Sequence, residues 1–429
     1  PSLSPARREE NVSDVRCDVA VIGAGMVGVC CASFLQRLGR QVTLIDRVAP
    51  GESCSFGNAG SLSWSSCVPI SVPGLLPKVP GWLLRSDGPL TIRWKYLPGL
   101  IPWLWRFVKS GNQAQVESSS RALSALHRPA LDLHRELARD AGVPELVRST
   151  DYLHVYSSQA AFDDARYTQG LRARFSGVEA EELDGEGIRS LEPQISQRYV
   201  KALRIPDQGY AANPGRLVKA YASRLTANGA TIIQDEVTEL VVKGNRVSVI
   251  NTSSSSIQPD AVVIAAGAWS ARLCAMLGVT VPLEAERGYH VTISEPGVSI
   301  SGTIMETDGM FVATPMEMGL RFAGTVELAN VDAAPNYARA DNILKLARRM
   351  FPDLRTDRVS RWMGCRPSLP DGLPVIGASP RQDNVYLAFG HAHTGMIGSP
   401  QTGRLIAGMV CHQPLNIDAE PFRVERFAR

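Results

Sequence analysis

The first part of the chain combines short apolar runs with a segment of helical periodicity. Residues 19–22 form an apolar run that is too short for a buried helix, and it leads directly into a glycine-rich turn at residues 23–28. Apolar residues then recur with a helical period, and a second apolar run at residues 42–45 ends at an acid. This order predicts a strand, a turn, a helix and a second strand, which together form a βαβ unit.

Later segments predict further helices and strands. The pair Asn213-Pro214 suits a helix N-cap followed by a proline in the first turn. Apolar spacing predicts helices at residues 122–141, 159–175, 214–227 and 336–350, and a last one that opens at 394–396 and runs to about 410. Strands are expected at 152–156, 199–205, within 231–250 and at 385–389, with a hairpin tip at 253–256. Alternating patterns predict antiparallel strands at 287–293, 309–314 and 319–325.

The apolar run at residues 260–270 is expected to return to the parallel sheet long after its second strand. Such an interrupted sheet is expected when distant segments clasp a large cofactor such as FAD. We therefore predict an α/β plus α+β protein, in which a Rossmann-type FAD-binding domain has an interrupted parallel sheet and a substrate domain has an antiparallel sheet. The expected FAD-binding segments are 15–66, 200–278 and 361–429, and the expected substrate-domain segments are 67–199 and 279–360.

Composition is that of a globular protein and excludes some partners. The 429 residues are 44% hydrophobic and 20% charged, which allows a large core and more than one domain. The net charge of +3 is spread without a basic block, so nucleic acid is not expected as a partner. The 8 cysteines show no C-x-x-C pair or histidine spacing, which predicts free thiols in a reducing compartment and no metal site.

Neither a secretory signal nor a membrane span is expected. Residues 1–14 are polar and charged, and we interpret them as a disordered lead-in to a cytoplasmic protein. The chain contains no uninterrupted apolar run of about 18 residues, the length that a membrane-spanning helix requires.

The glycine turn at residues 23–28 has the G-x-G-x-x-G spacing of a dinucleotide-binding fingerprint. In such a turn Gly23 makes the tight bend, Gly25 lets a pyrophosphate approach the backbone, and Gly28 lets the helix lie close to the strand. Asp46 follows at about the 20-residue spacing of an acid that binds ribose hydroxyls. NAD and FAD both use this fingerprint, and a glycine turn without a ligand is the alternative.

Two further segments are candidates for cofactor contact. The small, glycine-rich loop at residues 53–60 leaves the second strand at the carboxyl edge of the sheet, where its backbone N–H groups can meet an anion or a flavin edge. An ordinary surface loop is the alternative. The backbone at residues 236–238 is expected to meet an adenine ring.

Residues 68–111 are rich in proline, tryptophan and leucine, with lysines and arginines between them. The stretch 80–109 has the amphipathic composition of a segment that lies in a membrane interface, where tryptophan and basic side chains suit the headgroup level. The alternative is that its apolar faces pack against the second domain.

The fingerprint, the S-x-G-N-A-G loop, the Arg287-Gly288-Tyr289 segment and the closing motifs at 364–377 and 390–396 together resemble the FAD-dependent amino-acid oxidoreductases. The chain looks most like the bacterial D-amino-acid dehydrogenases, including relatives that act on hydroxyproline, with the glycine and sarcosine oxidases as cousins. The resemblance covers nearly the whole chain. It implies FAD bound across the Rossmann-type domain, with its isoalloxazine ring facing a pocket roofed by the antiparallel sheet.

The resemblance and the segments above imply one set of FAD-binding residues. These are Gly23, Gly25, Met26, Val27, Gly28, Asp46, Arg47, Ser53, Ser55, Gly57, Asn58, Ala59, Gly60, Val237, Ala265, Ala266, Gly267, Trp269, Gly364, Arg366, His393, Thr394, Gly395 and Met396. Cys365 lies close to the position of covalent flavin attachment in sarcosine oxidases, but the alignment there needs a gap. Noncovalent FAD is expected.

The resemblance also implies a substrate site. Arg366 falls where glycine oxidases place an arginine on the substrate carboxylate, and His393 falls where they place a second basic side chain. A guanidinium can hold a carboxylate by two parallel N–H bonds, although Arg366 can also be a buried arginine that caps carbonyls. The open N-terminus of a helix at Thr394, Gly395 and Met396 can stabilise the reduced flavin.

Four further side chains are weighed for this site. Tyr289 and His290 alternate on one strand, so at most one faces the substrate, and Tyr289 is the choice. Phe311 is expected to form a wall of the pocket, with core packing as an equal alternative. His391 is expected to tie the loop to the sheet.

The predicted activity is oxidation of a small amino acid, most of all a D-amino acid, with D-proline and hydroxyproline types included. Hydride passes from Cα of the neutral amine to flavin N5, and electrons pass on to a quinone or another carrier, with peripheral membrane contact. An oxidase that uses O2 is one alternative. A nicotinamide dehydrogenase is a second alternative, which is disfavoured because the regular alternation of strands and helices stops after Asp46. An inactive membrane-surface protein is a third, and the presence of Arg366 and Asp371 argues against it.

Overall fold

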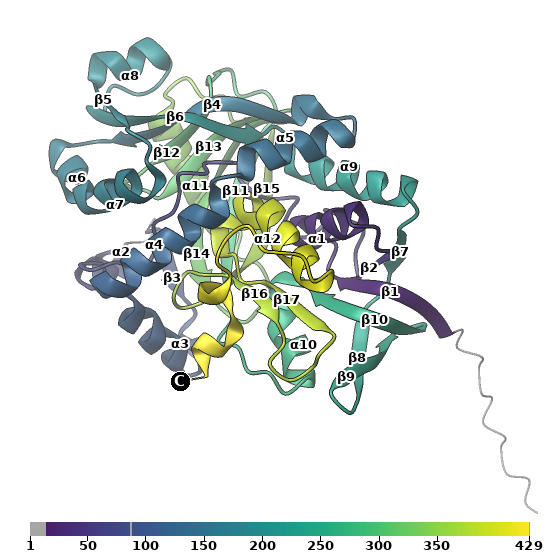
Figure 1. Cartoon of the computed structure of the whole chain (residues 1–429). Coiled ribbons are helices and arrows are strands. Elements are labelled where there is room, and N and C mark those ends of the chain that lie inside the picture. Colours follow the sequence, from purple (N-terminus) through teal and green to yellow (C-terminus); the bar gives the residue numbers. More distant parts are fainter. Residues whose placement is uncertain (1–13, 86–87, 429) are drawn as a thin grey trace, which may run out of the picture.

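Two large sheets lie side by side in the computed structural model, which describes residues 14–85 and 88–428 (Figure 1). One has 8 strands and the other has 9 strands. Asp14 already belongs to the first strand, and the remaining lead-in expected at residues 1–13 lies outside the described residues.

The first sheet is the predicted interrupted parallel sheet. Its main path runs β16 (Val375–Ala378), β17 (Val385–Phe389), β10 (Ser256–Ile264), β1 (Asp14–Ile22), β2 (Val42–Asp46) and β7 (Thr231–Gln234). The pairs from β17 through β10, β1 and β2 to β7 are parallel, as the apolar runs predicted, and β16 is antiparallel. A hairpin of β8 (Val237–Lys243) and β9 (Arg246–Thr252) joins β10 around the expected tip at residues 253–256.

Helices α1 (Met26–Arg37) and α12 (Gly395–Val410) pack together on this sheet. Their apolar faces share one core with β1 and β2, where Val19, Val21 and Leu44 are fully buried. Because the first and last helices of the chain pack against each other, the two distant ends of the sequence meet over the same sheet.

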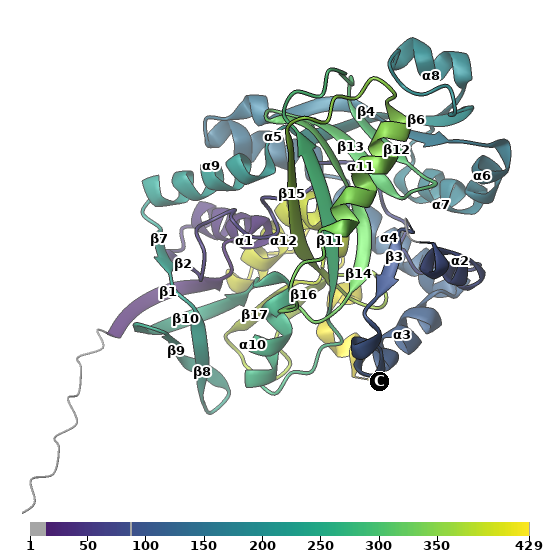
Figure 2. The same cartoon turned by 180° about the vertical axis from the view of Figure 1, so that it is seen from behind.

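The second sheet is mostly antiparallel, as predicted. Its order is β15 (Val359–Ser368), β11 (Glu284–Ile293), β14 (Gly319–Leu328), β13 (Phe311–Met316), β12 (Thr303–Glu306), β4 (Val147–Tyr156), β6 (Lys201–Ala211) and β5 (Glu181–Asp184), with β3 (Leu90–Ile92) added beside β14. Figure 2 shows helix α11 (Ala338–Met350) lying across β11 and β14 on one face. The other face is turned towards the first sheet.

Sheet membership moves two of the expected segment boundaries. Strand β6 lies in the second sheet although residues 200–278 were assigned to the FAD-binding domain, and β15 lies there although that domain was expected to resume at residue 361. Helices α4 (Gln113–His127) and α5 (Ala130–Asp140) come from the expected substrate segment, yet they pack on α12.

Two of the predicted helices are each split in two. The helix expected at 122–141 is instead α4 and α5, because Pro129 cannot donate a backbone hydrogen bond and its ring blocks the preceding turn. The helix expected at 159–175 is α6 (Gln159–Asp164) followed by α7 (Arg166–Ser176). Helix α9 (Pro214–Ala227) begins as predicted, since the Asn213 side chain accepts a hydrogen bond from the Arg216 N–H at 3.0 Å.

The remaining helices are α2 (Val79–Leu84), α3 (Leu97–Ser110), α8 (Gly185–Leu191) and α10 (Ser270–Met276). Across the described ranges 14–85 and 88–428, no helix has the length and apolar character needed to cross a membrane.

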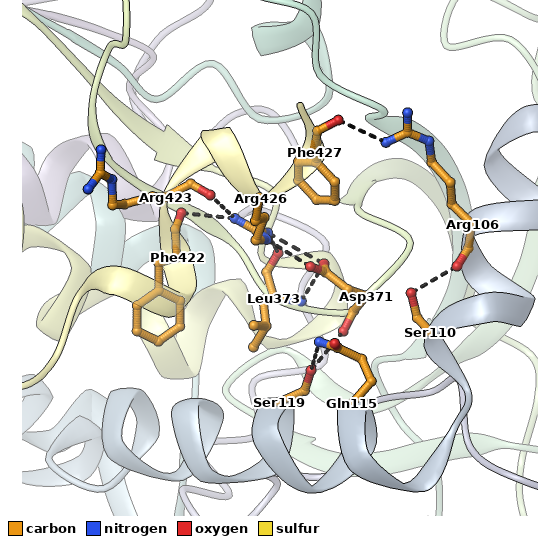
Figure 3. Close-up of polar contacts among 10 residues, drawn as sticks. All are labelled: Arg106, Ser110, Gln115, Ser119, Asp371, Leu373, Phe422, Arg423, Arg426 and Phe427. Atoms are coloured by element: carbon orange, nitrogen blue, oxygen red, sulfur yellow. Dashed lines mark hydrogen bonds and ion pairs between the residues drawn. The ribbon is translucent and has the colours of Figure 1, made fainter. Parts of the chain in front are cut away.

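The C-terminal segment is fastened by Asp371, a residue of the closing motif. Arg426 donates from Nε to its Oδ2 at 2.7 Å, and Leu373 N–H donates to its Oδ1 at 3.2 Å (Figure 3). The Asp371 carbonyl accepts from Ser119 Oγ on α4 at 3.4 Å. Asp371 does not line the cavity described below. Its presence therefore indicates a structural role in holding the C-terminal segment and is not evidence of an intact active site.

Candidate active site

A cavity of about 1150 Å³ lies between the two sheets. It is lined by Gly23 at the end of β1, by Ala265 at the end of β10 and by Thr394 before α12, together with the inner face of β11, β14 and β15. The predicted convergence of the two chain ends on one site is therefore confirmed.

The glycine turn forms one end of this cavity. Gly23 has φ +113°, and a Cβ on it would lie 2.4 Å from the Ala265 carbonyl oxygen, while a Cβ on Gly28 would lie 1.8 Å from the Gly23 carbonyl oxygen. These contacts seat α1 close to the sheet. Its first turn carries no acidic residue, and Gly25 at the N-cap has no side chain. The Met26 N–H donates to Ser55 Oγ at 2.9 Å, and the next N–H groups of the first turn suit a pyrophosphate.

Asp46 and its neighbour occupy the next part of the wall. Asp46 accepts hydrogen bonds from the N–H groups of Ala24 at 2.6 Å and Val48 at 3.2 Å, and burial raises its pKa against the effect of these bonds. The Arg47 guanidinium lies 4.1 Å from the centre of the Trp269 ring. Asp46 is thus held where the fingerprint predicts an acid for a ribose.

The loop at residues 53–60 is clamped against the second sheet. His290 Nδ1 lies 3.0 Å from the Gly57 carbonyl oxygen, and the His290 ring stacks on Trp362. Arg321 donates to the Asn58 carbonyl at 2.7 Å. The loop is therefore a fixed wall of the cavity rather than an ordinary surface loop.

Most of the expected cofactor residues line this cavity. Gly28 and Gly60 do not, because both are packed against other backbone. The rest of the set does: Gly23, Gly25, Met26, Val27, Asp46, Arg47, Ser53, Ser55, Gly57, Asn58, Ala59, Val237, Ala265, Ala266, Gly267, Trp269, Gly364, Arg366, His393, Thr394, Gly395 and Met396. An open helix N-terminus, a held acid and an elongated cavity fit the parts of a dinucleotide.

Arg366 lines the cavity from β15. It donates to the carbonyl oxygens of Thr325 at 3.1 Å and Gly324 at 3.5 Å on β14. Thr325 has φ +57°, and the pairing register of β14 with β11 shifts beside it, so an irregular strand aims these carbonyls at the guanidinium. Burial lowers the pKa of Arg366. The side chain remains a cation, since an arginine pKa is so high.

Glu286 is a residue that the sequence analysis missed. It lies directly opposite Arg366 in the register of β11 and β15 and lines the same cavity. Its side chain is only 6% exposed, and its Oε2 has no hydrogen-bond partner in the described part of the chain. Burial raises the pKa of Glu286, against the opposing effects of the Arg366 charge and the Ser368 hydroxyl.

His393 and His391 lie at the start of α12. The His393 ring projects into the cavity, and burial together with the Arg366 charge lowers its pKa to about 4. His391 Nε2 lies 2.8 Å from Thr402 Oγ1, so its side chain ties the loop to α12, while its backbone forms a bridge with Ser368 of the second sheet. The segment Thr394–Met396 borders the cavity and α12 has no side-chain cap, which leaves its N-terminus open there.

Tyr289 and Phe311 differ in their position relative to the cavity. Tyr289 lines the cavity, as expected, and its hydroxyl donates to Glu327 at 2.6 Å and accepts from the Asn336 N–H at 3.0 Å. Phe311 is buried against Phe322 and does not line the cavity. His290, the alternative on the same strand, is bonded to the Gly57 carbonyl oxygen and does not line the cavity.

Arg172 is a second residue that the sequence analysis missed. It lines the cavity from α7, and its nearest polar partner is the His154 ring at 3.4 Å. Its Nε has no partner, and no carboxylate lies within ion-pair distance of it in the described part of the chain. Its arginine-rich surroundings in the sequence gave no signal for this role.

One wall of the cavity comes from the tryptophan-rich segment. Apolar side chains of α2, β3 and α3 line it, among them Trp82, Ile92, Trp103, Leu104 and Phe107. Other large apolar side chains of the same segment face outwards, and these are Leu84, Trp94, Ile101 and Trp105, with exposed fractions of 87%, 71%, 57% and 70%. The segment therefore packs on the second domain on one side and is exposed on the other.

Comparison with known proteins agrees with this architecture. Residues 18–409 match the family described as FAD dependent oxidoreductase. The chain is 42% identical over 417 residues to a D-amino-acid oxidase of Bradyrhizobium diazoefficiens, which covers 95% of this chain and 98% of that relative. It is 30% identical over 420 residues to a D-amino acid dehydrogenase of the same species, which covers 96% of this chain and 99% of the relative.

Two solved structures share the fold. A glycine oxidase from Geobacillus kaustophilus matches with a TM-score of 0.74 at 23% identity, over 96% of this chain and 99% of its own. An L-proline dehydrogenase from P. horikoshii matches with a TM-score of 0.74 at 19% identity, over 97% of this chain and 99% of its own. The predicted combination of a Rossmann-type parallel sheet and an antiparallel sheet is thereby confirmed.

Proposed function

The chain belongs to the family of FAD-dependent oxidoreductases, and we propose that within it the protein oxidises small D-amino acids. The observation that carries this proposal is the position of Arg366 in the cavity. Its guanidinium, which has no carboxylate within ion-pair distance in the described part of the chain, faces the space between the dinucleotide site and the second sheet. The names of the relatives at 42% and 30% identity support the D configuration.

In this proposal Arg366 binds the substrate carboxylate by two parallel N–H bonds. The carbonyl oxygens of Thr325 and Gly324 fix the plane of the guanidinium, so the substrate enters in one orientation. His393 is neutral near pH 7 because its pKa is lowered to about 4, and it offers a ring nitrogen to the substrate without adding charge. When bound, FAD accepts a hydride from the substrate Cα, giving an imino acid that water hydrolyses.

The helix N-termini supply the fixed positive ends of the site. The N-terminus of α1 would hold the pyrophosphate, and the N-terminus of α12 at Thr394 would stabilise negative charge that develops at the other end of the cavity. Apolar side chains of α3 line a further wall of the cavity.

We propose that FAD is held noncovalently. The Cys365 thiol is buried, lies 3.7 Å from the Val331 carbonyl oxygen, and has its pKa raised to about 11 by burial. Cys365 borders the cavity, but it pairs with Arg287, so its side chain has the opposite parity to that of Arg366. The neighbouring Cys54 thiol is directed at the Cys365 carbonyl oxygen at 2.9 Å. Neither thiol is a good nucleophile for flavin attachment.

We further propose a quinone or another membrane-associated carrier as the electron acceptor. The apolar wall of α2 and α3 leads from the cavity to a surface that carries Trp94 and Trp105, flanked by Lys95, Arg106 and Lys109. Such a surface suits peripheral contact with a membrane that contains the acceptor. Direct use of O2 is the second candidate, and the oxidase name of the relative at 42% identity favours it.

Anaerobic flavin reduction tests the proposed activity. FAD-loaded protein would be mixed with D-, L- and N-methyl amino acids, with the hydroxyproline isomers included, and the loss of flavin absorbance would be followed. Bleaching by D-amino acids in preference to their L-enantiomers is the expected result. Failure of every amino acid to reduce the bound flavin would overturn the proposal. Readmission of air or of a soluble quinone then distinguishes the two acceptors by rate.

A further inference from the structure

Glu286 and Arg366 form a directly opposed pair on the inner face of the second sheet. They are register partners in the antiparallel pair β11 and β15, and both line the cavity. Side chains at such partner positions have Cβ atoms about 5 Å apart and stand on the same face of the sheet. An acid and a base at these positions would ordinarily join in an ion pair.

In this protein the two charges are held apart. The Arg366 guanidinium lies over Gly288, where a Cβ would come 2.3 Å from Nη2, and it donates to carbonyl oxygens of Thr325 and Gly324 on β14. It does not lie within ion-pair distance of Glu286, and Glu286 Oε2 is buried without a hydrogen-bond partner among the described residues. Because Gly288 has no Cβ, the guanidinium has room to lie over it and away from the carboxylate.

Among residues 14–85 and 88–428, the surroundings of Glu286 supply no other countercharge. On β14 its register partner is Leu328, and on β15 the neighbours are Arg366 and Ser368. The start of α12 contributes His393, and the loop at residues 66–70 contributes apolar and hydroxyl side chains. His393 is neutral near pH 7, since burial lowers its pKa to about 4. A buried carboxylate without a cation is costly, so a cation of a ligand would be favoured there.

We propose that Glu286 binds the ammonium group of the amino-acid substrate and accepts one proton from it. This inference rests on the proposed function, in which Arg366 binds the substrate carboxylate. A fixed cation and a separate fixed anion complement the two charges of a zwitterion. In the proton transfer, one N–H bond of the ammonium breaks and an O–H bond forms on Glu286, which leaves a neutral amine and a neutral carboxylic acid.

The chemistry of the reaction requires such a step, because hydride leaves Cα only from the neutral amine. Burial raises the pKa of Glu286, which makes its carboxylate a better proton acceptor than an exposed one. His393 is a second candidate base in the cavity, and its lowered pKa makes it a weak one. Glu286 is therefore the stronger candidate of the two.

Two non-reacting ligands separate recognition of the ammonium from recognition of the carboxylate. 2-Aminoisobutyrate carries both charges but no hydrogen on Cα, and isobutyrate is the same acid without the amine. Calorimetry on the FAD-loaded enzyme near neutral pH is expected to show 2-aminoisobutyrate binding about tenfold tighter or more, as for a charge-assisted hydrogen bond. The Glu286→Gln variant is expected to lose this preference while its affinity for isobutyrate changes less than about threefold.

The rate of flavin reduction supplies a second readout. With a reactive D-amino acid under anaerobic conditions, Glu286→Gln is expected to react about 100-fold more slowly near neutral pH, the typical contribution of a general base. The rate should recover as the pH approaches the pKa of the free ammonium, because the solution then supplies neutral amine. A loss that is equal at every pH would indicate a structural role and overturn the inference. Glu284→Gln is the matched control, since Glu284 lies on the same strand, bonded to Tyr96 and outside the cavity lining.

The outcomes separate the two proposals. If no amino acid reduces the flavin of the wild-type enzyme, the proposed function fails and this inference fails with it. If the wild-type enzyme reacts but Glu286→Gln keeps both its ligand preference and its rate, only the assignment of Glu286 fails. Should Glu286→Gln not fold, Glu286→Asp, which keeps the charge, is expected to retain the preference for 2-aminoisobutyrate. A wild-type enzyme that binds isobutyrate as tightly as 2-aminoisobutyrate overturns the inference without any variant.

Discussion

The guanidinium of Arg366 occupies the space that a side chain of residue 288 would fill, with Cζ only 2.4 Å from the position of a Cβ on Gly288. The substitution Gly288→Ala therefore forces Arg366 away from the carbonyl oxygens of Thr325 and Gly324. Because a charge-assisted hydrogen bond contributes about 1.5–3 kcal/mol, the KM for the amino acid should rise about 10- to 100-fold. Steady-state kinetics measures this, with the flavin content of the purified variant expected to stay constant.

Gly170→Ala is the control for this variant. Gly170 lies in α7, and a Cβ on it meets no other atom within 4 Å, so the general effect of exchanging glycine for alanine is expected to be small. An unchanged KM in Gly288→Ala would show that the position of the guanidinium does not control substrate binding.

The substitution Arg366→Lys tests the bidentate contact itself. A lysine keeps the positive charge but cannot present two parallel N–H donors, and it cannot reach both carbonyl oxygens of β14. We expect kcat/KM to fall by about 100-fold or more, with FAD retained. Arg361→Lys is the control, because Arg361 lies on the same strand in an exposed ion pair with Asp341. Turnover equal to that of the wild type would remove Arg366 from the site.

The sequence was sufficient to predict the cofactor half of this site. The glycine turn and Asp46 are contiguous with the strand and helix that position them, so their roles depend on local geometry alone. The loop at residues 53–60 followed from its place after β2. Each of these features depends on neighbours in the sequence, and none requires knowledge of which distant strands pair.

The substrate half depends on pairing between distant strands, and the sequence analysis was less successful there. Tyr289 lines the cavity and His290 does not, as chosen, but the residues of β11 that meet Arg366 are fixed only by the register of β11 with β15. The same register places Glu286 in the cavity. Which residues of β13 face the cavity depends on its pairing with β14, and this pairing leaves Phe311 outside the lining. Arg172 reaches the cavity from a helix of another layer, and no local pattern marks it.

Buried histidines make the stability of the fold depend on pH. His134 is fully buried, with Nε2 2.7 Å from the Met396 carbonyl oxygen, and burial lowers its pKa from 6.5 to about 4. As the pH falls, His134 becomes protonated near pH 6.5 in the unfolded chain but only near pH 4 in the folded protein. The stabilisation from neutral His134 is therefore complete above about pH 6.5 and is lost as the pH falls towards about 4. For this one group the loss is on the order of 3 kcal/mol.

Denaturant unfolding at about pH 7 and about pH 5 measures this dependence. The wild-type free energy of unfolding should be lower at the acidic pH, and the difference between the two values should be smaller in His134→Gln. His412→Gln is the control, because His412 is exposed. A variant whose pH dependence matches that of the wild type would exclude His134 as a contributor.

The contact between Asp371 and Arg426 should stabilise the C-terminal segment without contributing to catalysis. Arg426 donates to Asp371 at 2.7 Å, and their side chains are 16% and 9% exposed (Figure 3). Asp371→Asn should lower the free energy of unfolding by about 2 kcal/mol, as for a lost hydrogen bond to a charged group, while the KM of the folded enzyme stays unchanged. Thermal unfolding and kinetics measure the two quantities, with Asp353→Asn as an exposed control. A changed KM at unchanged stability would instead assign Asp371 to the site.

The outward side of α3 and the turn before it should bind membranes through Trp94 and Trp105. Both rings are about two-thirds exposed or more, and lysines and arginines flank them, which suits a bilayer interface with anionic lipids. Replacing both with serine should lower the affinity for phosphatidylglycerol-containing vesicles, measured by co-sedimentation, about 100-fold, because each buried aromatic side chain contributes at least about 1.5 kcal/mol. Anaerobic reduction of the flavin by the substrate should not change, since neither ring lines the cavity.

Tyr337→Ser removes an exposed aromatic ring next to α11 and serves as the control. Equal sedimentation of all three proteins would leave the exposed tryptophans without a membrane role and favour direct transfer of electrons to O2.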